Sequence, residues 1–341
     1  MSSVFIDTLQ GKITNRPPVW FMRQAGRISP TYRKLRETYS FQQLMSDPTL
    51  AAQVTLMPVN EFGVDAAILF SDILVIPQAL GLEVDFPDSG PVFKNALCRQ
   101  TSKTTLHYNP SKLDYIYAAI DEINKTKTPD FPLIGFCGGP FTTFLFMAQG
   151  TSSNHQFSEA MTYYYNNRKT LLSLLEQITD ASIDYAVKQC EHGIAAFQIF
   201  ETYGGLLPTE VYLKDVYPQI KRLIAAVKAT GVPVIYFPKG LGTGLAHIND
   251  CGADFVSIDW QVSLTDARKM IDKSIGLQGN FDPRLLSVSD TSIIKEALEP
   301  YKAFWQENKK FIFNLGHGIT PDNTFENAKF TIDTIKLITN S

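Results

Sequence analysis

The sequence contains little cysteine, with four in 341 residues. Cys98, Cys137, Cys190 and Cys251 lie far apart, and no two of them form a C-x-x-C pair. This spacing argues against a disulfide framework and against a finger-type zinc site. It favours a reducing environment, and we expect the protein to be cytoplasmic.

The sequence also lacks long hydrophobic runs and an excess of charge of one sign. Nowhere do roughly 18 apolar residues follow one another, as a membrane-spanning helix needs, and the first residues do not resemble a signal peptide. Lys and Arg number 31 against 34 Asp and Glu, which leaves a formal net charge of −3. We therefore expect no membrane and no nucleic-acid partner, and a local basic patch wherever an anionic ligand binds.

Apolar side chains are abundant, because 44% of the residues are hydrophobic and 19% are charged. This composition can fill at least one large core and excludes a disordered or coiled-coil protein. No Gly/Ser-rich or Pro-rich linker divides the chain. We expect a single domain over residues 1–341.

Short β-rich apolar runs recur along the chain, each followed by a turn and then by a longer stretch of helical periodicity. They occupy residues 19–21, 66–70, 133–136, 195–200, 234–237, 255–258, 275–278 and 311–315. Hairpin signals are missing between most of these runs, which predicts parallel strands joined by crossover helices. The predicted fold class is α/β, a single (β/α)8 TIM barrel with its active site at the C-terminal ends of the strands.

The segments between the runs predict helices and one insertion. Helices are expected over residues 47–62, with Asp47 as the cap, over 111–127 and over 208–228. The segment from about residue 71 to about residue 132 is too long for a simple crossover. We expect it to be an insertion on the barrel rim, with a small hairpin before its helix.

Polar residues follow the predicted strands, at the end of a barrel where active sites lie. Many such residues are structural, because strand ends meet water in any barrel. The residues in question are Arg23, Arg27, Asp72, Glu201, Thr202, Tyr203, Lys239, Asp259, Trp260, Asn280, Asp282 and His317.

The Met-Arg-Gln-Ala-Gly-Arg segment departs from this background. Arg23 and Arg27 flank a small Ala-Gly pair that lets a ligand approach the backbone, and two guanidinium groups suit two carboxylates. Arg36 on the following helix could extend this basic patch. For Arg33, a solvated helix face is the better interpretation.

Two further residues have alternative interpretations. Asp72 has strongly apolar neighbours, and because an unpaired buried carboxylate is costly, it either pairs with Arg23 or Arg27 or serves a ligand. His317 lies in a Gly-His-Gly sequence and either packs as a turn residue or serves the site. The Gly-Leu-Gly-Thr-Gly run at 240–244 lacks the spacing of a phosphate-binding loop and predicts a strand-to-helix turn.

Five blocks of sequence resemble the uroporphyrinogen decarboxylase family. The blocks are PVWFMRQAGR at 18–27, FSDILVIPQALGLEV at 70–84, IGFCGGP at 134–140, GNFDP at 279–283 and NLGHGITPD at 314–322. They span nearly the whole chain in the right order, and the first two are highly specific to the family. The resemblance implies a (β/α)8 barrel, a homodimer and a carboxy-lyase. Its reaction in haem biosynthesis would remove carbon dioxide from the four acetate arms of uroporphyrinogen III to give coproporphyrinogen III.

The resemblance also implies which residues form the site. Asp72 and Arg23 are expected to be catalytic, with Asp72 stabilising a protonated pyrrole iminium; because the substrate then supplies its own electron sink, we expect no cofactor and no metal. The proton donor stays open. The expected substrate-binding residues are Arg23, Gln24, Ala25, Gly26, Arg27, Phe41, Asp72, Phe146, Thr202 and His317.

The sequence departs from the family pattern at four positions. Ile28 and Thr31 stand where Tyr and Glu are common, and Phe141 stands where Trp is usual. Phe146 stands where a functional Tyr is expected. Its ring remains, but any hydrogen bond of the hydroxyl must be absent, replaced by water or supplied elsewhere.

Two other functions compete with this one. A zinc-dependent methyltransferase on the same barrel would need a His-x-Cys pair and a distant Cys, whereas Cys190 and His192 come in the reverse order and His247 lies four residues before Cys251. A tetrapyrrole-binding protein without catalytic activity is the second alternative, and only the Phe146 change favours it.

Overall fold

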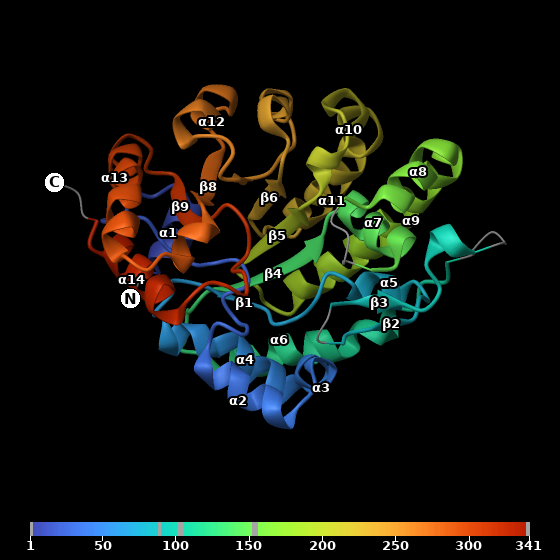
Figure 1. Cartoon of the computed structure of the whole chain (residues 1–341), viewed down its shortest axis with the longest axis horizontal. Coiled ribbons are helices and arrows are strands. Elements are labelled where there is room, and N and C mark those ends of the chain that lie inside the picture. The colour runs from blue at the N-terminus through green and yellow to red at the C-terminus, as the bar shows by residue number, and fades with distance from the viewer. Residues whose placement is uncertain (1–2, 88–89, 101–105, 152–155, 339–341) are drawn as a thin grey trace.

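Seven parallel strands form one curled sheet, a half-barrel with helices around its outside (Figure 1). The computed structural model describes residues 3–87, 90–100, 106–151 and 156–338. The strand order is β1-β4-β5-β6-β7-β8-β9. These strands are β1 (Ala67–Ile68), β4 (Leu133–Gly138), β5 (Ala196–Glu201), β6 (Val234–Pro238), β7 (Phe255–Ile258), β8 (Gly276–Phe281) and β9 (Phe311–Leu315).

These strands coincide with seven of the eight apolar runs in the sequence. Every residue of β4, β6, β7, β8 and β9 is buried, as parallel strands covered on both faces should be. Neighbouring strands are parallel throughout; Phe200 of β5, for example, pairs with Phe237 of β6. The predicted α/β fold with a parallel sheet is confirmed.

The prediction of a strand at residues 19–21 is wrong. Val19 makes only an isolated parallel bridge to Phe313 of β9. The preceding residues, Pro17 and Pro18, have no N–H to donate to a ladder, and the N–H of Val19 donates to the side chain of Asp65 at 2.8 Å. Among the described residues, the sheet is therefore a seven-stranded half-barrel and not a closed ring of eight strands.

A layer of buried polar side chains lies inside the curl. Nε2 of Gln278 donates to Oε1 of Gln198 and to Oγ of Ser257, each at 3.1 Å, and Oε1 of Gln278 accepts from Nε1 of Trp20 at 3.1 Å. Because β5 and β8 are not neighbours, their side chains can meet only in the interior. This layer fixes the indole of Trp20 there and so positions the segment that leads to Arg23.

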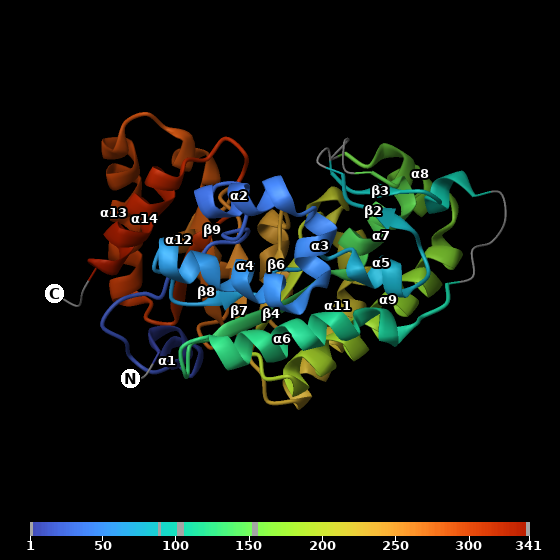
Figure 2. The same ribbon diagram turned by 90° about the horizontal axis from the view of Figure 1, so that it is seen from below.

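The helices cover the outer face of the sheet (Figures 1 and 2). The first seven are α1 (Val4–Leu9), α2 (Pro30–Thr38), α3 (Phe41–Ser46), α4 (Pro48–Glu61), α5 (Val75–Ala79), α6 (Asp114–Thr126) and α7 (Pro140–Gln149). In the described part of the chain, these are followed by α8 (Ser158–Asn166), α9 (Arg168–Glu191), α10 (Thr209–Asp215), α11 (Tyr217–Ala229), α12 (Leu264–Met270), α13 (Thr291–Glu307) and α14 (Phe325–Lys336). Short 3-10 helices are η1 (Leu97–Arg99), η2 (Pro110–Leu113), η3 (Gly204–Leu206), η4 (Gly242–His247) and η5 (Pro283–Ser287).

The predicted helices form, with changed boundaries. Asp47 caps α4, and its Oδ1 accepts from the backbone N–H of Thr49 and Leu50 at 2.9 and 3.0 Å. The predicted helix over 208–228 is instead two helices, α10 and α11, that meet at Val216. Pro218 causes this break, because it has no N–H to bond back into the preceding turn.

The long segment between β1 and β4 contains the predicted hairpin. Strands β2 (Val84–Asp85) and β3 (Val92–Phe93) pair antiparallel. The expected helix over 111–127 begins as η2 and continues as α6, which runs along one side of the molecule beneath β4 in Figure 2. The four cysteines are all free thiols. Among the described residues, no helix is both long and apolar enough to span a bilayer.

Candidate active site

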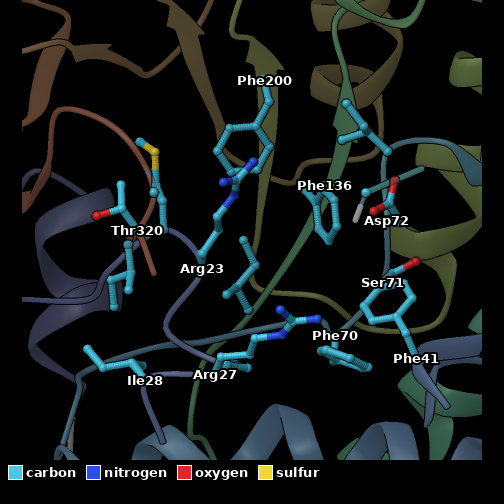
Figure 3. A pocket seen from close by; sticks show the side chains of 18 of the residues that line it. Arg23, Arg27, Ile28, Phe41, Phe70, Ser71, Asp72, Phe136, Phe200 and Thr320 are labelled. Carbon is cyan, nitrogen blue, oxygen red and sulfur yellow. The ribbon is translucent and has the colours of Figure 1, made fainter. Parts of the chain in front are cut away.

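A cavity of about 460 Å³ lies at the carboxyl ends of β1, β4, β5, β6 and β9 (Figure 3). Its size falls within the range of roughly 300–1,000 Å³ that is typical of ligand pockets. The segment before α2, the chain after β1, residues 86–87 and 90–91 between β2 and β3, and the loop after β9 complete its wall. This is the end of the sheet at which the sequence predicts the active site.

The floor of the cavity is aromatic. Phe136, Phe200 and Phe237 come from β4, β5 and β6, and all three line the cavity. The ring centroids of Phe136 and Phe200 lie 5.7 Å apart, and those of Phe200 and Phe237 lie 6.3 Å apart, in each case edge to face. Three rings packed edge to face make an apolar and rigid surface.

A second aromatic group forms one side wall. Phe70 packs edge-on against Phe41 at 5.4 Å and against Tyr32 at 5.9 Å, and Phe41 contacts Phe86 of the hairpin at 5.4 Å. These rings join α2, α3, the end of β1 and the insertion. The hairpin therefore contributes directly to the cavity.

Arg23 reaches into the cavity from a strained backbone. Its φ angle is 62°, in the left-handed region that residues other than glycine rarely adopt. A Cβ at Gly318 would lie 2.5 Å from Cδ of Arg23, so only glycine leaves room for this side chain. Strain of this kind persists where surrounding structure enforces it, commonly at functional sites. In Figure 3, the guanidinium group lies beside Phe200.

Arg27 and Arg36 line the same cavity as Arg23. Arg36 belongs to α2, whose start is capped by Ser29 through a hydrogen bond from Tyr32 N at 3.0 Å. Arg33 lies on the exposed face of α2 and outside the cavity, as expected. Three guanidinium groups thus concentrate positive charge on one side of the cavity.

Asp72 also lines the cavity and has no ion pair among the described residues. Its Oδ1 accepts a hydrogen bond from the backbone N–H of Leu74 at 2.8 Å. Burial raises the pKa of Asp72, and the Leu74 hydrogen bond and the charge of Arg23 oppose this rise. Of the two interpretations of Asp72, the salt bridge to Arg23 or Arg27 does not form, which leaves the carboxylate available to a ligand.

His317 lines the cavity on the side of β9. Its Nδ1 accepts a hydrogen bond from the N–H of Gly318 at 2.6 Å. In the neutral imidazole this bond leaves the proton on Nε2, which can then donate to an anionic ligand. The ring also lies 6.4 Å from that of Trp260.

The structure brings together eight of the ten predicted substrate-binding residues. Gln24 and Phe146 are not in the cavity lining. Gln24 is 1% exposed and bonds to Phe21 N and Ala66 O, so it connects its segment to the residue before β1. The eight residues that line the cavity are Arg23, Ala25, Gly26, Arg27, Phe41, Asp72, Thr202 and His317.

Phe146 is buried on α7 behind the cavity. Its ring lies 6.0 Å from that of Tyr203 and 5.3 Å from that of Phe157. Burial raises the pKa of Tyr203 and the charge of Arg23 opposes this rise. The phenol of Tyr203 is therefore within electrostatic reach of Arg23, next to the ring that lacks a hydroxyl.

Several of the polar residues at strand ends have structural partners. Glu201 is fully buried and accepts hydrogen bonds from the N–H of Phe141 and of Thr142 at the start of α7. Burial raises its pKa to about 7, against these hydrogen bonds and one from the Thr142 hydroxyl. Asp282 forms an ion pair with Arg284 at 2.6 Å.

Most of the aromatic lining was not predicted from the sequence. Phe136, Phe200 and Phe237 lie inside apolar runs, where a phenylalanine that faces a cavity cannot be distinguished from one that faces the core. Ser71 was equally unremarked, although it precedes Asp72 and lines the cavity. One signal could have identified the cavity-facing phenylalanines. It is the alternation of side-chain direction along each strand, combined with the predicted position of the carboxyl end of the strand.

The site combines an apolar floor, a cationic side and one available carboxylate. Such a cavity fits a hydrophobic ligand with several carboxylate arms, and Asp72 can accept N–H hydrogen bonds from it or stabilise a positive charge. Among the described residues, no three His, Cys, Asp or Glu side chains form a group that could hold a metal. His192, two residues after Cys190, forms a hydrogen bond between its Nδ1 and Oδ1 of Asp121 at 2.7 Å.

Comparison with known proteins gives one consistent result. The family model for uroporphyrinogen decarboxylase (URO-D) matches residues 2–337. The uroporphyrinogen decarboxylase of Dichelobacter nodosus is 40% identical over 337 residues, covering 98% of this chain and 97% of the relative. That of Chlorobaculum tepidum is 38% identical with the same coverage, and that of Pelobacter propionicus is 37% identical over the full length of both chains.

Solved structures share the fold at low sequence identity. A methyltransferase from Methanosarcina mazei has a TM-score of 0.79 and 18% identity, with 98% of this chain and 99% of that chain covered. A B12-independent methionine synthase from Shewanella has a TM-score of 0.54 and 10% identity, with 85% of each chain covered. At these identities, the likeness concerns the fold alone.

Proposed function

The chain belongs to the uroporphyrinogen decarboxylase family, and from that membership we propose how its residues carry out the reaction. The protein is a carboxy-lyase that converts uroporphyrinogen to coproporphyrinogen by removing carbon dioxide from the acetate arms. The observation that supports our assignment of roles is that Arg23, Arg27 and Asp72 line one cavity with an aromatic floor.

The chemical problem is the electron pair that remains when carbon dioxide leaves. A neutral pyrrole is electron-rich and accepts this pair poorly. Protonation of a pyrrole carbon next to the one that bears the acetate gives a cationic iminium, which accepts the pair as the bond to the carboxylate breaks. The exocyclic carbon then takes up a proton and becomes a methyl group, and the ring loses the proton it gained.

Asp72 has the role of stabilising the cation. Its carboxylate accepts the pyrrole N–H hydrogen bonds, and its negative charge favours the iminium more strongly than water would, because the surrounding Phe136 and Phe70 exclude water. An electrostatic interaction that strengthens as charge develops lowers the barrier. Asp72 has no ion pair in the described part of the chain, so substrate binding need not break one.

Arg23 and Arg27 hold carboxylate arms of the substrate. Guanidinium groups can bind carboxylates through two parallel hydrogen bonds, which fixes the orientation of the macrocycle over the floor. We assign Arg23 a catalytic role as well, because its charge acts on Asp72 and its side chain is held in place by its strained backbone. Thr202 and His317 contact the substrate from the loops that follow β5 and β9, and Ala25, Gly26 and Phe41 shape the wall.

Gln24 and Phe146 act from behind the cavity lining. Gln24 supports the Arg23–Arg27 segment through its hydrogen bonds to Phe21 N and Ala66 O. Phe146 supports the aromatic packing around Tyr203.

Three features of the whole molecule are part of the proposal. The first is a single barrel domain over residues 1–341, closed by the segment at 19–21, with an insertion at about 71–132 on its rim. Hydrogen bonds support closure on both sides of the gap, from Trp20 N to Phe313 O at 3.4 Å and from Asp65 N to Val19 O at 2.8 Å. The other two features are a homodimer, which the family resemblance supports, and a cytoplasmic location, which the four free thiols support.

One assay tests the reaction. The purified protein is incubated anaerobically with reduced uroporphyrinogen, with and without a chelator, and the porphyrins are separated by carboxyl count. We expect conversion to the four-carboxyl product, equal in both samples. If the eight-carboxyl species persists, the proposal is overturned, and tight binding without product would instead identify a non-catalytic tetrapyrrole-binding protein.

A further inference from the structure

A second basic element lies beyond His317, outside the cavity lining. Lys239 follows β6 and Trp260 follows β7. Nζ of Lys239 lies 5.5 Å from the centroid of the Trp260 ring, and that ring lies 6.4 Å from the ring of His317, which lines the cavity. An unbroken row of side chains therefore leads from the cavity to Lys239.

The charge of Lys239 is not compensated. In the described part of the chain, its ammonium group has no hydrogen bond or ion pair. It lies over the face of the Trp260 ring. The carboxylate of Asp259, whose charge acts on Lys239, instead accepts hydrogen bonds from the N–H groups of Gly240 and Gln261, at 2.6 and 2.9 Å. Desolvation lowers the pKa of Lys239, and the charge of Asp259 opposes this only in part.

Arg284 also lies over the ring of Trp260, but unlike Lys239 it has an acidic partner. Its guanidinium carbon lies 5.6 Å from the Trp260 centroid, and its charge is paired with Asp282 at 2.6 Å. Lys239 is therefore the cation of this cluster that lacks an anion. A partly desolvated ammonium without a counter-ion is costly, and an anionic ligand would remove this cost.

We propose that Lys239, held against Trp260, forms a second carboxylate-binding subsite that takes an arm of the anionic tetrapyrrole beyond His317. This inference rests on the proposed function, because it assigns part of the same substrate. It adds a binding residue that is not in the cavity lining.

The topology supports a subsite at this position. β6 is the middle strand of the seven, whereas the segment that carries Arg23 and Arg27 bonds to the two edges, at β9 and beside β1. Lys239 thus follows the strand that is farthest in the sheet from both of these edges. The substrate carries carboxylate arms on all four pyrroles, so a macrocycle held by Arg23, Arg27 and Arg36 on one side still directs anionic arms toward the other.

The test compares binding and catalysis in matched variants. Oxidised uroporphyrin serves as a stable anionic probe in a fluorescence titration, and KM and kcat are measured with reduced uroporphyrinogen. Lys239→Met keeps the length and apolar body of the side chain and removes the charge. We expect Kd and KM to rise about tenfold and kcat to change less than about twofold, with Lys239→Arg restoring most of the affinity.

Lys309→Met is the control. Lys309 also lies over a tryptophan, with Nζ 3.6 Å from the Trp305 centroid, but it precedes β9 and so belongs to the opposite end of the sheet. This variant should bind the probe as the wild type does. If Lys239→Met matches Lys309→Met in both Kd and KM, the subsite is refuted.

Chemical labelling gives an independent measurement. An amine-reactive reagent should modify Lys239 faster than exposed lysines, and uroporphyrin should protect it; modification that is unaffected by the probe contradicts the subsite. The two proposals can fail separately. A wild-type protein that releases no carbon dioxide defeats the proposed function, whereas an active enzyme with an unaffected Lys239→Met variant defeats only this inference.

Discussion

The same burial that makes Asp72 costly to the folded protein makes it useful in the reaction. An ionised carboxylate among phenylalanine side chains interacts strongly with any cation that develops beside it, because little water screens the charge. Arg23 moderates the cost from a distance without forming an ion pair with the carboxylate. The carboxylate of Asp72 and the guanidinium group of Arg23 therefore remain separate in the free protein, and a bound substrate can interact with both.

Replacement of Asp72 tests its electrostatic role. We expect Asp72→Asn to lower kcat at least about a hundredfold, equivalent to about 2.7 kcal/mol, because a neutral amide cannot stabilise the developing cation. Steady-state kinetics with reduced uroporphyrinogen measure this. Asp85→Asn, at an exposed aspartate of the nearby hairpin, is the control and should have normal kcat. A near-normal kcat in Asp72→Asn would remove Asp72 from the mechanism.

The pH dependence of the reaction gives a second test of Asp72. Its pKa is raised, so its carboxylate becomes protonated at a higher pH than an ordinary aspartate. Since the ionised form is required, kcat should fall on the acidic side as the pH decreases through this raised pKa. The pH profile of kcat measures the effect, and this acidic limb should be missing in Asp72→Asn. An unchanged limb in the variant would assign it to another group.

Arg27 is predicted to act chiefly in binding. Arg27→Ala removes a charge-assisted contact worth roughly 1.5 to 3 kcal/mol, so KM should rise about tenfold or more while kcat changes little. Arg33→Ala is a matched control, because Arg33 lies on the exposed face of α2, outside the cavity. Equal KM values for the two variants would show that Arg27 is structural.

The motifs with charged side chains could be identified from the sequence, because two arginines flank a small Ala-Gly pair and one aspartate stands among strongly apolar neighbours. Arg23, Arg27 and Asp72 were recognisable in this way, and they do line one cavity. The aromatic floor was not recognisable, since a phenylalanine in a buried strand has the same sequence signature on either face. The placement of Phe146 behind the cavity depends on how α7 packs on its neighbours, which no local pattern specifies.

At the scale of elements, the side chain of Glu201 joins the carboxyl end of β5 to the start of α7. Glu201 accepts from the first N–H groups of α7 and so satisfies donors that a helix start leaves unpaired. A Cβ at Gly139 would lie 2.4 Å from Oε2 of Glu201, so glycine is required for this close approach. The junction supports both Thr202, which follows Glu201, and the ring of Phe136 on β4.

This junction should make stability depend on pH. The pKa of Glu201 is raised by burial to about 7 from a usual value of 4.5, so the folded state binds its proton more tightly than the unfolded state does. Its contribution is therefore greatest below about pH 4.5 and is lost as the pH rises through about 7. Glu201→Gln mimics the protonated form, so its free energy of unfolding relative to the wild type should rise between pH 5 and pH 8, by up to about 3 kcal/mol.

Urea denaturation at the two pH values measures this difference. Glu296→Gln, at an exposed glutamate of α13, is the control and should follow the wild type at both. If the relative stability of Glu201→Gln is the same at pH 5 and pH 8, Glu201 does not titrate differently in the folded protein.

Helices and strands could be predicted where the local sequence signal was strong. They could not be predicted where a residue distant in the sequence determines the pairing. Seven strands and the cap of α4 by Asp47 follow from local patterns. The segment at 19–21 has the composition of a strand, but its pairing depends on Asp65, which is distant in the sequence. The break between α10 and α11 was readable from Pro218, and the periodicity of the apolar residues across it obscured the signal.

At the scale of the whole molecule, the two edges of the sheet are connected through the segment that carries the arginines. Asp65 is the main contact on one side: Arg16 binds its carboxylate through two hydrogen bonds at 2.6 and 2.7 Å, and Val19 N donates to it at 2.8 Å. On the other side, Phe313 N donates to Pro18 O at 2.9 Å. The position of Arg23 therefore depends on contacts that lie well outside the cavity.

Loss of Asp65 should weaken both the fold and the site. The carboxylate is 9% exposed and Arg16 is 19% exposed, so Asp65→Ala leaves a largely buried guanidinium unpaired. We expect the free energy of unfolding to fall by about 2 to 3 kcal/mol. This loss is smaller than the roughly 3 to 5 kcal/mol for breaking a fully buried ion pair, because water reaches Arg16. Urea denaturation measures this loss, and faster hydrogen exchange at Val19 and Trp20 should accompany it.

Asp333→Ala is the control, because it breaks an exposed ion pair with Lys329 on α14. It should lower the free energy of unfolding by about 0.5 kcal/mol or less. Equal losses in the two variants would contradict a role of Asp65 in joining the sheet edges.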